Sequence, residues 1–519
     1  MRRILPVDIT PERFERALTA FGAIVGKDWV LDDDIDRDAY ADAYALGDAT
    51  THAPSAAIAP ASVEEVQAVL RVANEFGIPL WPISRGKNYG YGGAAPCMPG
   101  TLVLDLGRMR RILDVDVRRA YCVVEPGVGF FDLYQFLEQE KLPLWAPMPG
   151  NCIGSVLGNA LEHGTAYGPH GDRANNFCGM EVVLPDGELI RTGMGAMAGA
   201  DAWHLFRYSY GPGWDQMFTQ SNLGIVTKLG VWLMQEPEAA MELRMELPDE
   251  EDIGWVIETL APLRQAGVIK SQVNIGNFMR YVMGSSQRDD WYRGEGAMPE
   301  DIQADIRHQR NVGWWGLEIM LYGYREVIEA EAAVIRRAFA AQTTNEFTTR
   351  LWKRGEPRPP FPHYGVPISF PLRIANWISP YGGHLGFSPI LPPEREPLLA
   401  QLRRSRQMFR DYGFDFYGGF TLGERHVTVV NMLAYDRQDE DMVRRGRELL
   451  LALMADAKSR GYSEYRSHLA FMDEVAQSYD FNGHALARLN NKIKDALDPQ
   501  GILAPGKQGI WPARYRKQG

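Results

Sequence analysis

Apolar and polar residues alternate between strand-like and helix-like patterns from residue 54 to residue 128. A helix is predicted to begin after Ser62, because Glu65 follows at capping-box spacing, and to end at Gly77. Short apolar runs, which are typical of buried strands, occur at 56–59, 79–83, 101–106 and 121–124. The pattern therefore predicts an α+β unit in this part of the chain.

A second mixed region covers residues 154–235. It contains predicted strands at 180–184 and 188–192, joined by a two-residue Asp-Gly turn within Pro185-Asp186-Gly187. A further strand is predicted over 224–234.

The character of the chain changes after Pro237. Long amphipathic stretches at 250–266 and 324–341 predict helices, and the segment 344–366, rich in proline and charge, predicts a surface loop. Further strands are predicted near 314–322 and 367–371. We interpret the whole as an α+β nucleotide-binding domain in two parts, 1–236 and 463–519, interrupted by an inserted α+β domain, 237–462.

Composition narrows the function classes. The chain has 519 residues, a formal net charge of −11 and four cysteines without a CxxC pair. An acidic surface argues against binding to nucleic acid or an anionic membrane. The cysteine spacing predicts neither a zinc site nor a disulfide framework. No apolar run is long enough to span a membrane, and the N-terminus lacks the core of a signal peptide, so we predict a cytoplasmic protein.

A glycine-rich turn follows the predicted strand 79–83. Four glycines in the decapeptide 84–93 permit positive φ angles and close backbone approach, so several N–H groups can point at a pyrophosphate. The turn matches neither the dinucleotide fingerprint nor a P-loop. By itself it is equally consistent with nucleotide binding and with an ordinary turn.

Several motifs carry a family resemblance, in order along nearly the whole chain. They are Gly90-Tyr91-Gly92-Gly93-Ala94-Ala95-Pro96, Val124-Glu125-Pro126-Gly127-Val128, Gly158-Asn159, Glu181-Val182-Val183-Leu184-Pro185, residues 219–228, residues 382–389, Glu464-Tyr465-Arg466 and Leu503-Ala504-Pro505-Gly506-Lys507. The chain resembles the vanillyl-alcohol oxidase and p-cresol methylhydroxylase flavoprotein family, and within it the eugenol oxidases.

The resemblance implies a two-part FAD-binding domain with a substrate cap domain inserted between the parts. His384 matches the histidine that the oxidase branch joins covalently to the 8α-methyl carbon of FAD. Residues expected to contact the cofactor are Ser84, Arg85, Gly86, Lys87, Asn88, Tyr89, Gly90, Gly92, Gly158, Asn159, Ile225 and Lys507.

Tyr91, Tyr465 and Arg466 match the trio that holds the phenolic oxygen of the substrate. A phenol has a pKa of about 10 in water, and two hydroxyl donors with a guanidinium favour its anion. The resemblance thus implies benzylic hydride transfer from a para-substituted phenol to FAD, with a quinone methide as intermediate and O₂ as acceptor. It also implies a homodimer or a higher homo-oligomer.

The chain departs from the family pattern at several pocket positions. Asn151 stands where the oxidases carry an aspartate that assists proton transfer, and a pocket glutamine aligns near Gly419. Thr165 and His170 complete the predicted substrate pocket, although a structural or surface role is the favoured interpretation of His170. Smaller side chains at 151 and 419 predict a wider cavity, which would accept a phenol ring with two methoxy groups.

Two other functions stay open on sequence grounds. The first is a dehydrogenase subunit that passes electrons to a cytochrome c, since Trp145-Ala146-Pro147 resembles that branch. The second is a flavin-binding protein without catalysis, because the aspartate is absent.

Overall fold

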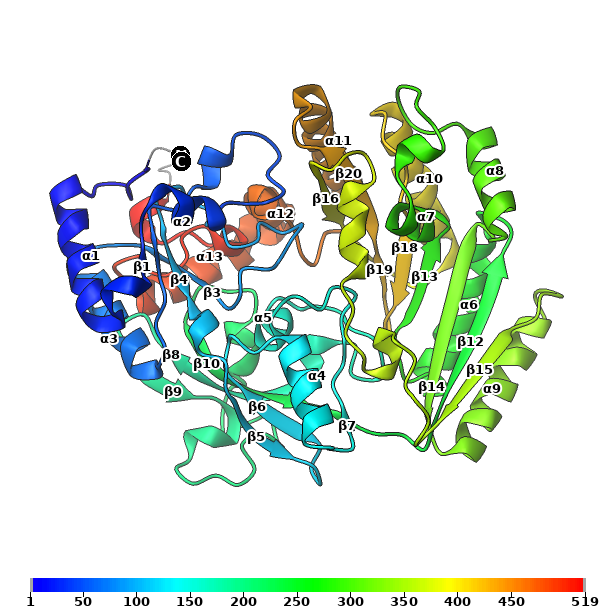
Figure 1. Ribbon diagram of the computed structural model, residues 1–519, viewed down its shortest axis with the longest axis horizontal. Coiled ribbons are helices and arrows are strands. Elements are labelled where there is room, and N and C mark those ends of the chain that lie inside the picture. The colour runs from blue at the N-terminus through cyan, green and yellow to red at the C-terminus, as the bar shows by residue number, and fades with distance from the viewer. Residues whose placement is uncertain (1–2, 517–519) are drawn as a thin grey trace.

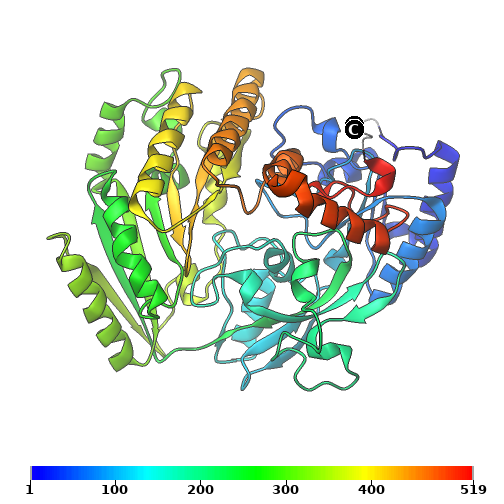
Figure 2. The same ribbon diagram turned by 180° about the vertical axis from the view of Figure 1, so that it is seen from behind.

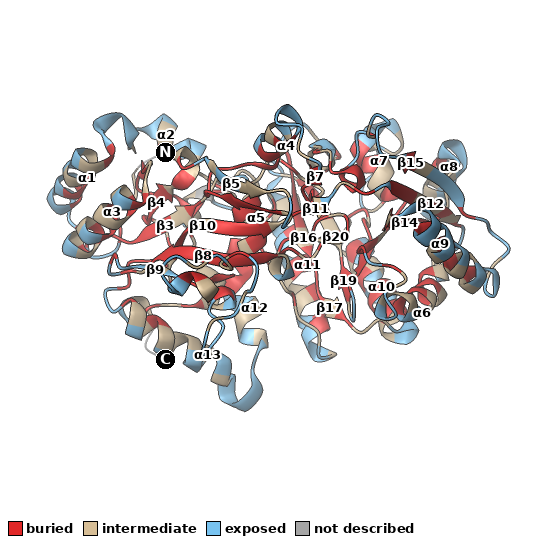
Figure 3. Cartoon of the chain, turned by 90° about the horizontal axis from the view of Figure 1, so that it is seen from below, coloured by how far each residue is buried: buried red, intermediate tan, exposed pale blue. Residues whose placement is uncertain are grey.

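The structure is a computed structural model that describes residues 3–516. Its chain forms two lobes side by side, one built from both ends of the sequence and one from its middle (Figure 1). Buried strands form the interior of both lobes, and the exposed faces of helices lie outside (Figure 3). The α+β architecture predicted from the sequence is confirmed.

The first lobe begins with a four-stranded sheet in the order β1-β2-β4-β3. Its strands are β1 (Val30–Leu31), β2 (Ala57–Ile58), β3 (Leu80–Ile83) and β4 (Leu102–Asp105). Strands β2, β4 and β3 are parallel. The helices of this region are α1 (Pro11–Val25), α2 (Asp34–Ala39) and α3 (Val63–Phe76), and α1 packs on α3.

Helix α3 begins and ends as predicted. The Ser62 hydroxyl accepts a hydrogen bond from the Glu65 N–H, and Gly77 ends the helix in the left-handed region at φ +64°. The Glu65 carboxylate bonds the Ala61 N–H rather than that of Ser62, so the capping box is displaced by one residue.

A five-stranded antiparallel sheet follows, in the order β5-β6-β10-β8-β9. Its strands are β5 (Ile112–Asp116), β6 (Tyr121–Val124), β8 (Phe177–Val183), β9 (Leu189–Arg191) and β10 (Ile225–Trp232). Short β7 (Leu144–Trp145) pairs with β11 (Met234–Gln235), and helices α4 (Phe130–Gln139) and α5 (Val156–Leu161) complete this region.

The predicted hairpin of β8 and β9 is confirmed, but its turn has three residues and not two. Leu184 and Glu188 still pair, so three residues form the connection. The Gly187 N–H bonds the Leu184 carbonyl and Gly187 has φ +90°, which fits a type I turn followed by a left-handed residue.

The second lobe is organised around a seven-stranded sheet in the order β15-β12-β14-β13-β18-β19-β17. Its strands are β12 (Ala239–Leu247), β13 (Val273–Asn277), β14 (Trp315–Gly323), β15 (Thr348–Lys353), β17 (Ile390–Leu391), β18 (Gly419–Leu422) and β19 (Val427–Val429). A separate pair joins β16 (Gly382–Phe387) to β20 (Asn431–Asp436). The helices are α6 (Asp252–Gln265), α7 (Met279–Ser285), α8 (Glu300–Arg310), α9 (Arg325–Ala340), α10 (Arg395–Asp411) and α11 (Glu440–Ser459).

Two predictions in this lobe are wrong. The predicted loop 344–366 contains β15, an edge strand in which only Trp352 is buried, so its apolar pattern is weak. The predicted strand 367–371 is instead irregular and leads into a 3₁₀ helix, Phe370–Asn376. Pro367 and Pro371 lack the N–H groups that a strand would need.

The C-terminal segment returns to the first lobe, beside the N-terminal elements (Figure 2). It contains α12 (Met472–Ser478) and α13 (Phe481–Leu497). Leu503 then pairs with Leu80 of β3, so the chain end extends the first sheet. The exact domain boundaries at 236/237 and 462/463 stay predictions.

A buried ion pair holds the C-terminal segment against the first lobe. Lys494 is fully buried, and its Nζ lies 2.7 Å from Asp498 Oδ2 and donates to the Asn222 and Leu503 carbonyls at 2.6 and 2.8 Å. Asp498 in turn accepts the N–H groups of Ile502 and Leu503. The pair therefore positions the strand-like segment that ends in Lys507.

The four cysteines are free thiols. Cys122, Cys152 and Cys178 are buried, whereas Cys97 is only partly buried. Within residues 3–516, no helix combines the length and the apolar character that crossing a bilayer requires.

Replacing Lys494 with Met should destabilise the first lobe by about 3–5 kcal/mol, because Asp498 would remain buried without its partner. The expected result is a lower thermal midpoint by circular dichroism. Lys492→Met, at an exposed position of the same helix, is the control. Equal midpoints for the two variants would contradict the role of the pair.

Candidate active site

A cavity of about 420 Å³ lies where the two lobes meet. Its wall combines the glycine-rich turn after β3, the start of α5, the C-terminal segment and a few residues of the second lobe. Strand β3 aims the turn into this space because it is buried between β4 and the returning C-terminal segment. Residues far apart in the sequence therefore share one site.

Most of the predicted cofactor residues line this cavity. They are Ser84, Arg85, Gly86, Lys87, Asn88, Tyr89, Gly158, Asn159, Ile225 and Lys507. Gly90 and Gly92 are not among the described lining residues. Gly92 lies behind the turn against Leu469, and Gly90 packs on His384.

Two glycines let the backbone approach closely here. A Cβ on Gly90, which has φ +85°, would lie 3.3 Å from both Nε2 and the carbonyl oxygen of His384. A Cβ on Gly158 would lie 2.4 Å from the Ser84 hydroxyl oxygen. The glycine turn is thus pressed against α5 on one side and against β16 on the other.

The wall fits a nucleotide cofactor such as FAD. The side-chain oxygen of Asn159 is buried without a hydrogen-bond partner, although a bound ligand can supply a donor. Lys507 forms an ion pair with Glu162, and both side chains line the cavity. The neighbouring Lys507 and Arg466 charges lower the pKa of Glu162 against the opposing effect of burial.

His384 lies on β16 with its imidazole against the cavity. Its side chain is buried, and Nδ1 has no hydrogen-bond partner. Burial lowers the pKa of His384 to about 4, so the ring is neutral at pH 7. The ring of Tyr44 lies 5.0 Å away, centroid to centroid. A neutral imidazole with a free nitrogen is a competent nucleophile.

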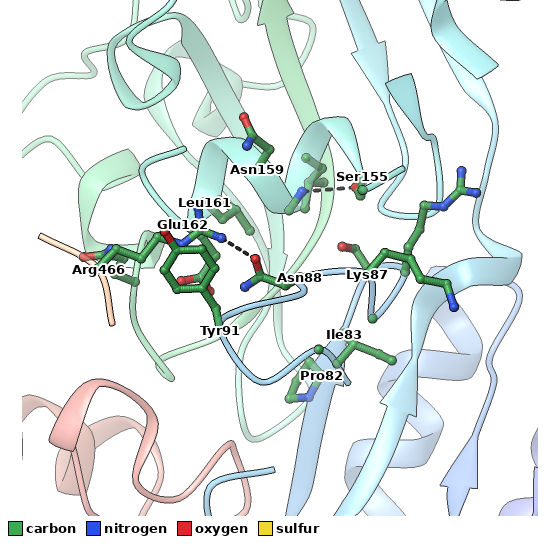
Figure 4. A pocket seen from close by; sticks show the side chains of 18 of the residues that line it. Pro82, Ile83, Lys87, Asn88, Tyr91, Ser155, Asn159, Leu161, Glu162 and Arg466 are labelled. Atoms are coloured by element: carbon green, nitrogen blue, oxygen red, sulfur yellow. Dashed lines mark hydrogen bonds between the residues drawn. The ribbon is translucent and has the colours of Figure 1, made fainter. Parts of the chain in front are cut away.

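Tyr91 and Arg466 are in direct contact. The Arg466 Cζ lies 3.9 Å from the centroid of the Tyr91 ring, and the guanidinium also donates to the Asn88 side chain (Figure 4). Tyr465 lines the same cavity, and its carbonyl accepts a hydrogen bond from Gln220 at 2.9 Å. The structure thus brings Tyr91, Tyr465 and Arg466 together beside His384.

The electrostatics keep both tyrosines protonated. Burial raises the pKa of Tyr91 and of Tyr465, and the nearby Arg466 charge only partly offsets this effect. Neutral hydroxyls act as hydrogen-bond donors, while Arg466 supplies a positive charge. The Nε of Arg466 is buried without a partner. The arrangement can therefore bind a small anion, such as a phenolate oxygen.

Glu464 is a buried acid that sequence reasoning assigned no role, although it directly precedes Tyr465. One carboxyl oxygen accepts the Ser388 N–H at 3.2 Å, and the other has no partner. Burial raises the pKa of Glu464 to about 8. The residue links the end of β16, which carries His384, to the segment that carries Tyr465 and Arg466.

Only two of the four predicted substrate-pocket residues lie at the cavity. Asn151 and Thr165 line the cavity, but His170 and Gly419 are not among its described lining residues. His170 lies beside Arg173 and lines a smaller space with Tyr167, and burial lowers its pKa to about 4. Gly419 is paired within the seven-stranded sheet, and a Cβ there would meet the Ile275 carbonyl. The expectation of a cavity widened at Gly419 finds no support in this placement.

Sequence reasoning missed apolar residues of the cavity wall. Pro371 ends the segment wrongly predicted as a strand, Leu372 directly follows it, and Met432 comes from β20. Their apolar character resembles that of ordinary core residues, so the sequence carries no signal that would single them out.

Comparison with known proteins agrees with this geometry. The family model "FAD binding domain" matches residues 54–193, and "FAD linked oxidases, C-terminal domain" matches residues 325–508. The flavoprotein subunit of 4-cresol dehydrogenase [hydroxylating] from Pseudomonas putida is 33% identical, with 98% of each chain covered.

Solved structures agree as well. A 4-ethylphenol oxidase from Gulosibacter chungangensis, in complex with isoeugenol, superposes with a TM-score of 0.94 at 33% identity, covering 99% of this chain and 100% of that one. The chain belongs to the vanillyl-alcohol oxidase and p-cresol methylhydroxylase flavoprotein family. A substrate-bound p-cresol methylhydroxylase gives a TM-score of 0.92 at 32% identity, covering 98% and 99% of the two chains. The protein is therefore an FAD-dependent oxidoreductase with the two-part domain and inserted cap of this family.

Replacing Glu464 with Gln should change the pH dependence of stability. The unfolded carboxyl ionises near pH 4.5, whereas the folded one holds its proton to about pH 8. Raising the pH through this window favours unfolding of the wild type by roughly 1.4 kcal/mol per unit. The thermal midpoint of the wild type should therefore fall relative to that of Glu464→Gln between pH 5 and 8.

The exposed Glu474→Gln is the matched control and should follow the wild type. Parallel midpoints for wild type and Glu464→Gln across this range would show that the buried acid does not titrate as described.

Proposed function

We propose that this enzyme oxidises para-substituted phenols at the carbon attached to the ring. The observation that supports it is the meeting of Tyr91, Tyr465, Arg466 and His384 in one cavity. The substrate class comprises 4-alkyl-, 4-allyl- and 4-hydroxymethyl-phenols. The named relatives act on 4-cresol and 4-ethylphenol, which belong to it.

The trio activates the substrate by binding its anion. Two hydroxyl donors and the Arg466 guanidinium favour the phenolate. Its charge is delocalised through the ring to the para position, which makes loss of a benzylic hydride feasible. FAD, when bound, accepts that hydride. Addition of water to the resulting quinone methide gives a benzylic alcohol, and loss of a further proton gives an alkene.

We also propose that His384 carries FAD as an 8α-histidyl adduct. The neutral ring, the unpartnered Nδ1 and the burial of the side chain support this role. Asn151 lines the site where the oxidases have a carboxylate. An amide cannot act as a general base, so another group or water takes the proton.

For the electron acceptor we propose O₂. The histidine at 384 supports the oxidase branch, whereas the alternative, a cytochrome c partner, is supported by the similarity to the 4-cresol dehydrogenase subunit. Stopped-flow mixing of the reduced enzyme with air-saturated buffer separates them. Reoxidation within seconds is expected of an oxidase, and slow reoxidation with fast turnover by an artificial acceptor would favour the cytochrome.

The finer expectations on environment and assembly are a homo-oligomer, most simply a dimer, and a cytoplasmic location. Sedimentation velocity of the purified holoenzyme tests the first. Steady-state comparison of guaiacyl and syringyl substrates tests the expectation that the cavity accepts a phenol ring with two methoxy groups.

Anaerobic addition of 4-ethylphenol should bleach the flavin absorbance, and its O-methylated analogue should not, because it cannot form the anion. Arg466→Lys should lower kcat/KM by about 10- to 100-fold, the effect of losing a charge-assisted hydrogen bond. Arg425→Lys, at an exposed position, is the control. Flavin reduction by the O-methylated compound would contradict phenolate activation.

Acid precipitation should leave the yellow colour in the protein pellet of the wild type. In His384→Ala the colour should remain in the supernatant, while FAD still binds noncovalently through the glycine turn. Colour retained in the His384→Ala pellet would place the covalent link elsewhere.

A further inference from the structure

The segment 42–46 of the first lobe crosses to the second lobe and packs on the strand pair β16–β20. Leu46 is buried and belongs to the apolar cluster formed by β16, β20 and α11. The hydroxyl of Tyr435, on β20, donates a hydrogen bond to the Tyr44 carbonyl. The segment therefore lies directly against the strand pair that carries His384.

A buried chain of hydrogen bonds holds the start of this segment. Asp42 Oδ1 accepts the Tyr44 N–H at 2.9 Å, and Oδ2 accepts from His468 Nε2 at 2.8 Å. Because His468 Nδ1 accepts the Ala470 N–H at 3.2 Å, Nε2 is the nitrogen that carries the proton. Burial alone would raise the pKa of Asp42, but the bonds from His468 and Tyr44 lower it, so Asp42 is a carboxylate at pH 7. Both polar groups of the Tyr44 backbone are therefore fixed.

The Tyr44 ring is held against two residues of the cofactor site. Its centroid lies 5.0 Å from that of the His384 ring and 5.4 Å from that of the Tyr89 ring, both in tilted arrangements. Tyr89 lines the cavity, whereas Tyr44 is not among its described lining residues. Tyr44 therefore acts on a bound cofactor through its neighbours.

The imidazole of His384 depends on packing for its orientation. Its Nδ1 is buried without a hydrogen-bond partner, so no bond at that nitrogen fixes the ring. The backbone of Gly90 is a second close neighbour, since a Cβ there would lie 3.3 Å from Nε2. Without the Tyr44 ring, the imidazole would have space to turn. A bond forms quickly only when the reacting atoms are held close and aligned, so such freedom should slow any reaction of this ring.

We propose that Tyr44 is a positioning residue, whose ring holds the His384 imidazole in the orientation in which it links to FAD. This inference rests on the role proposed above for His384. In the linking step a C–N bond forms between the 8α carbon and an imidazole nitrogen, while one C–H bond of the 8α methyl group and the imidazole N–H bond break. The electron pair left over passes to the isoalloxazine ring, which takes up two protons. O₂ then reoxidises the reduced ring and becomes H₂O₂.

The rate of attachment tests the role of Tyr44. Full-length protein produced without flavin is mixed with FAD, samples are precipitated with acid at intervals, and the flavin in the pellet is measured. Tyr44→Ala should slow attachment by about 10- to 100-fold, the cost of a misplaced reacting group. Tyr44→Phe keeps the ring and should stay within twofold of the wild type. Tyr324→Ala, at an exposed tyrosine of the second lobe, is the control.

A second variant changes only the anchor of the segment. Tyr435→Phe keeps its buried ring but loses the hydroxyl that holds the Tyr44 carbonyl, so attachment should slow by about 2- to 10-fold, the range for one neutral hydrogen bond. A wild-type rate in Tyr44→Ala, or a rate in Tyr44→Phe as slow as that expected of Tyr44→Ala, overturns the proposal. If Tyr44→Ala does not fold, a wild-type rate in Tyr435→Phe overturns it.

Noncovalent affinity separates positioning of one ring from a general loss of structure. In a His384→Ala background, the Kd for FAD, measured by quenching of flavin fluorescence, should agree within twofold with and without Tyr44→Ala. A Kd raised tenfold or more by Tyr44→Ala would show that Tyr44 shapes the whole site, and would overturn the proposal.

The same measurements distinguish this proposal from the ones on which it depends. If the wild type never retains flavin in the pellet, the covalent role of His384 is wrong and the role of Tyr44 is wrong with it. If the wild type and Tyr44→Ala link equally fast, only the role of Tyr44 is wrong. Bleaching by 4-ethylphenol needs bound FAD but no covalent link, so it tests the oxidation separately.

Discussion

The contact of Arg466 with Tyr91 and Asn88 is the interaction on which the rest of the site depends. It joins the C-terminal part of the chain to the glycine turn, over 370 positions away in the sequence. The guanidinium is held over an aromatic ring and against an amide oxygen, so it enters the cavity in one orientation, and the neighbouring Glu162 carboxylate is already ion-paired with Lys507. A cation fixed in this way is available to an anionic ligand.

The surroundings of this contact are arranged to keep its charge in place. The returning segment is tied to β3 through the buried Lys494–Asp498 pair and the bridge from Leu80 to Leu503. On the other side, Glu464 bonds the end of β16 and holds its proton at neutral pH. An ionised carboxylate next to Tyr465 would oppose a bound phenolate, and protonation removes that repulsion.

The second lobe contributes less to the cofactor than to the shape of the substrate space. His384, Pro371, Leu372 and Met432 approach the cavity from it. A second cavity, bordered by Tyr465 and Thr165, also lies between the two lobes. Ligand cavities occur preferentially where two domains meet, because neither sheet can fill the space between them with regular structure.

The sequence by itself determined many of the local elements and the motifs from which the site is built. Capping at Ser62 and Gly77, the strand before the glycine turn and the ordered motifs depend on neighbours close in the chain, and so they could be predicted. The tertiary structure alone decided what shares the cavity. Asn151 and Thr165 entered it, His170 and Gly419 did not, and the unassigned Glu464 became a buried acid. The physical reason is that burial and proximity are set by contacts across hundreds of residues, which no local pattern records.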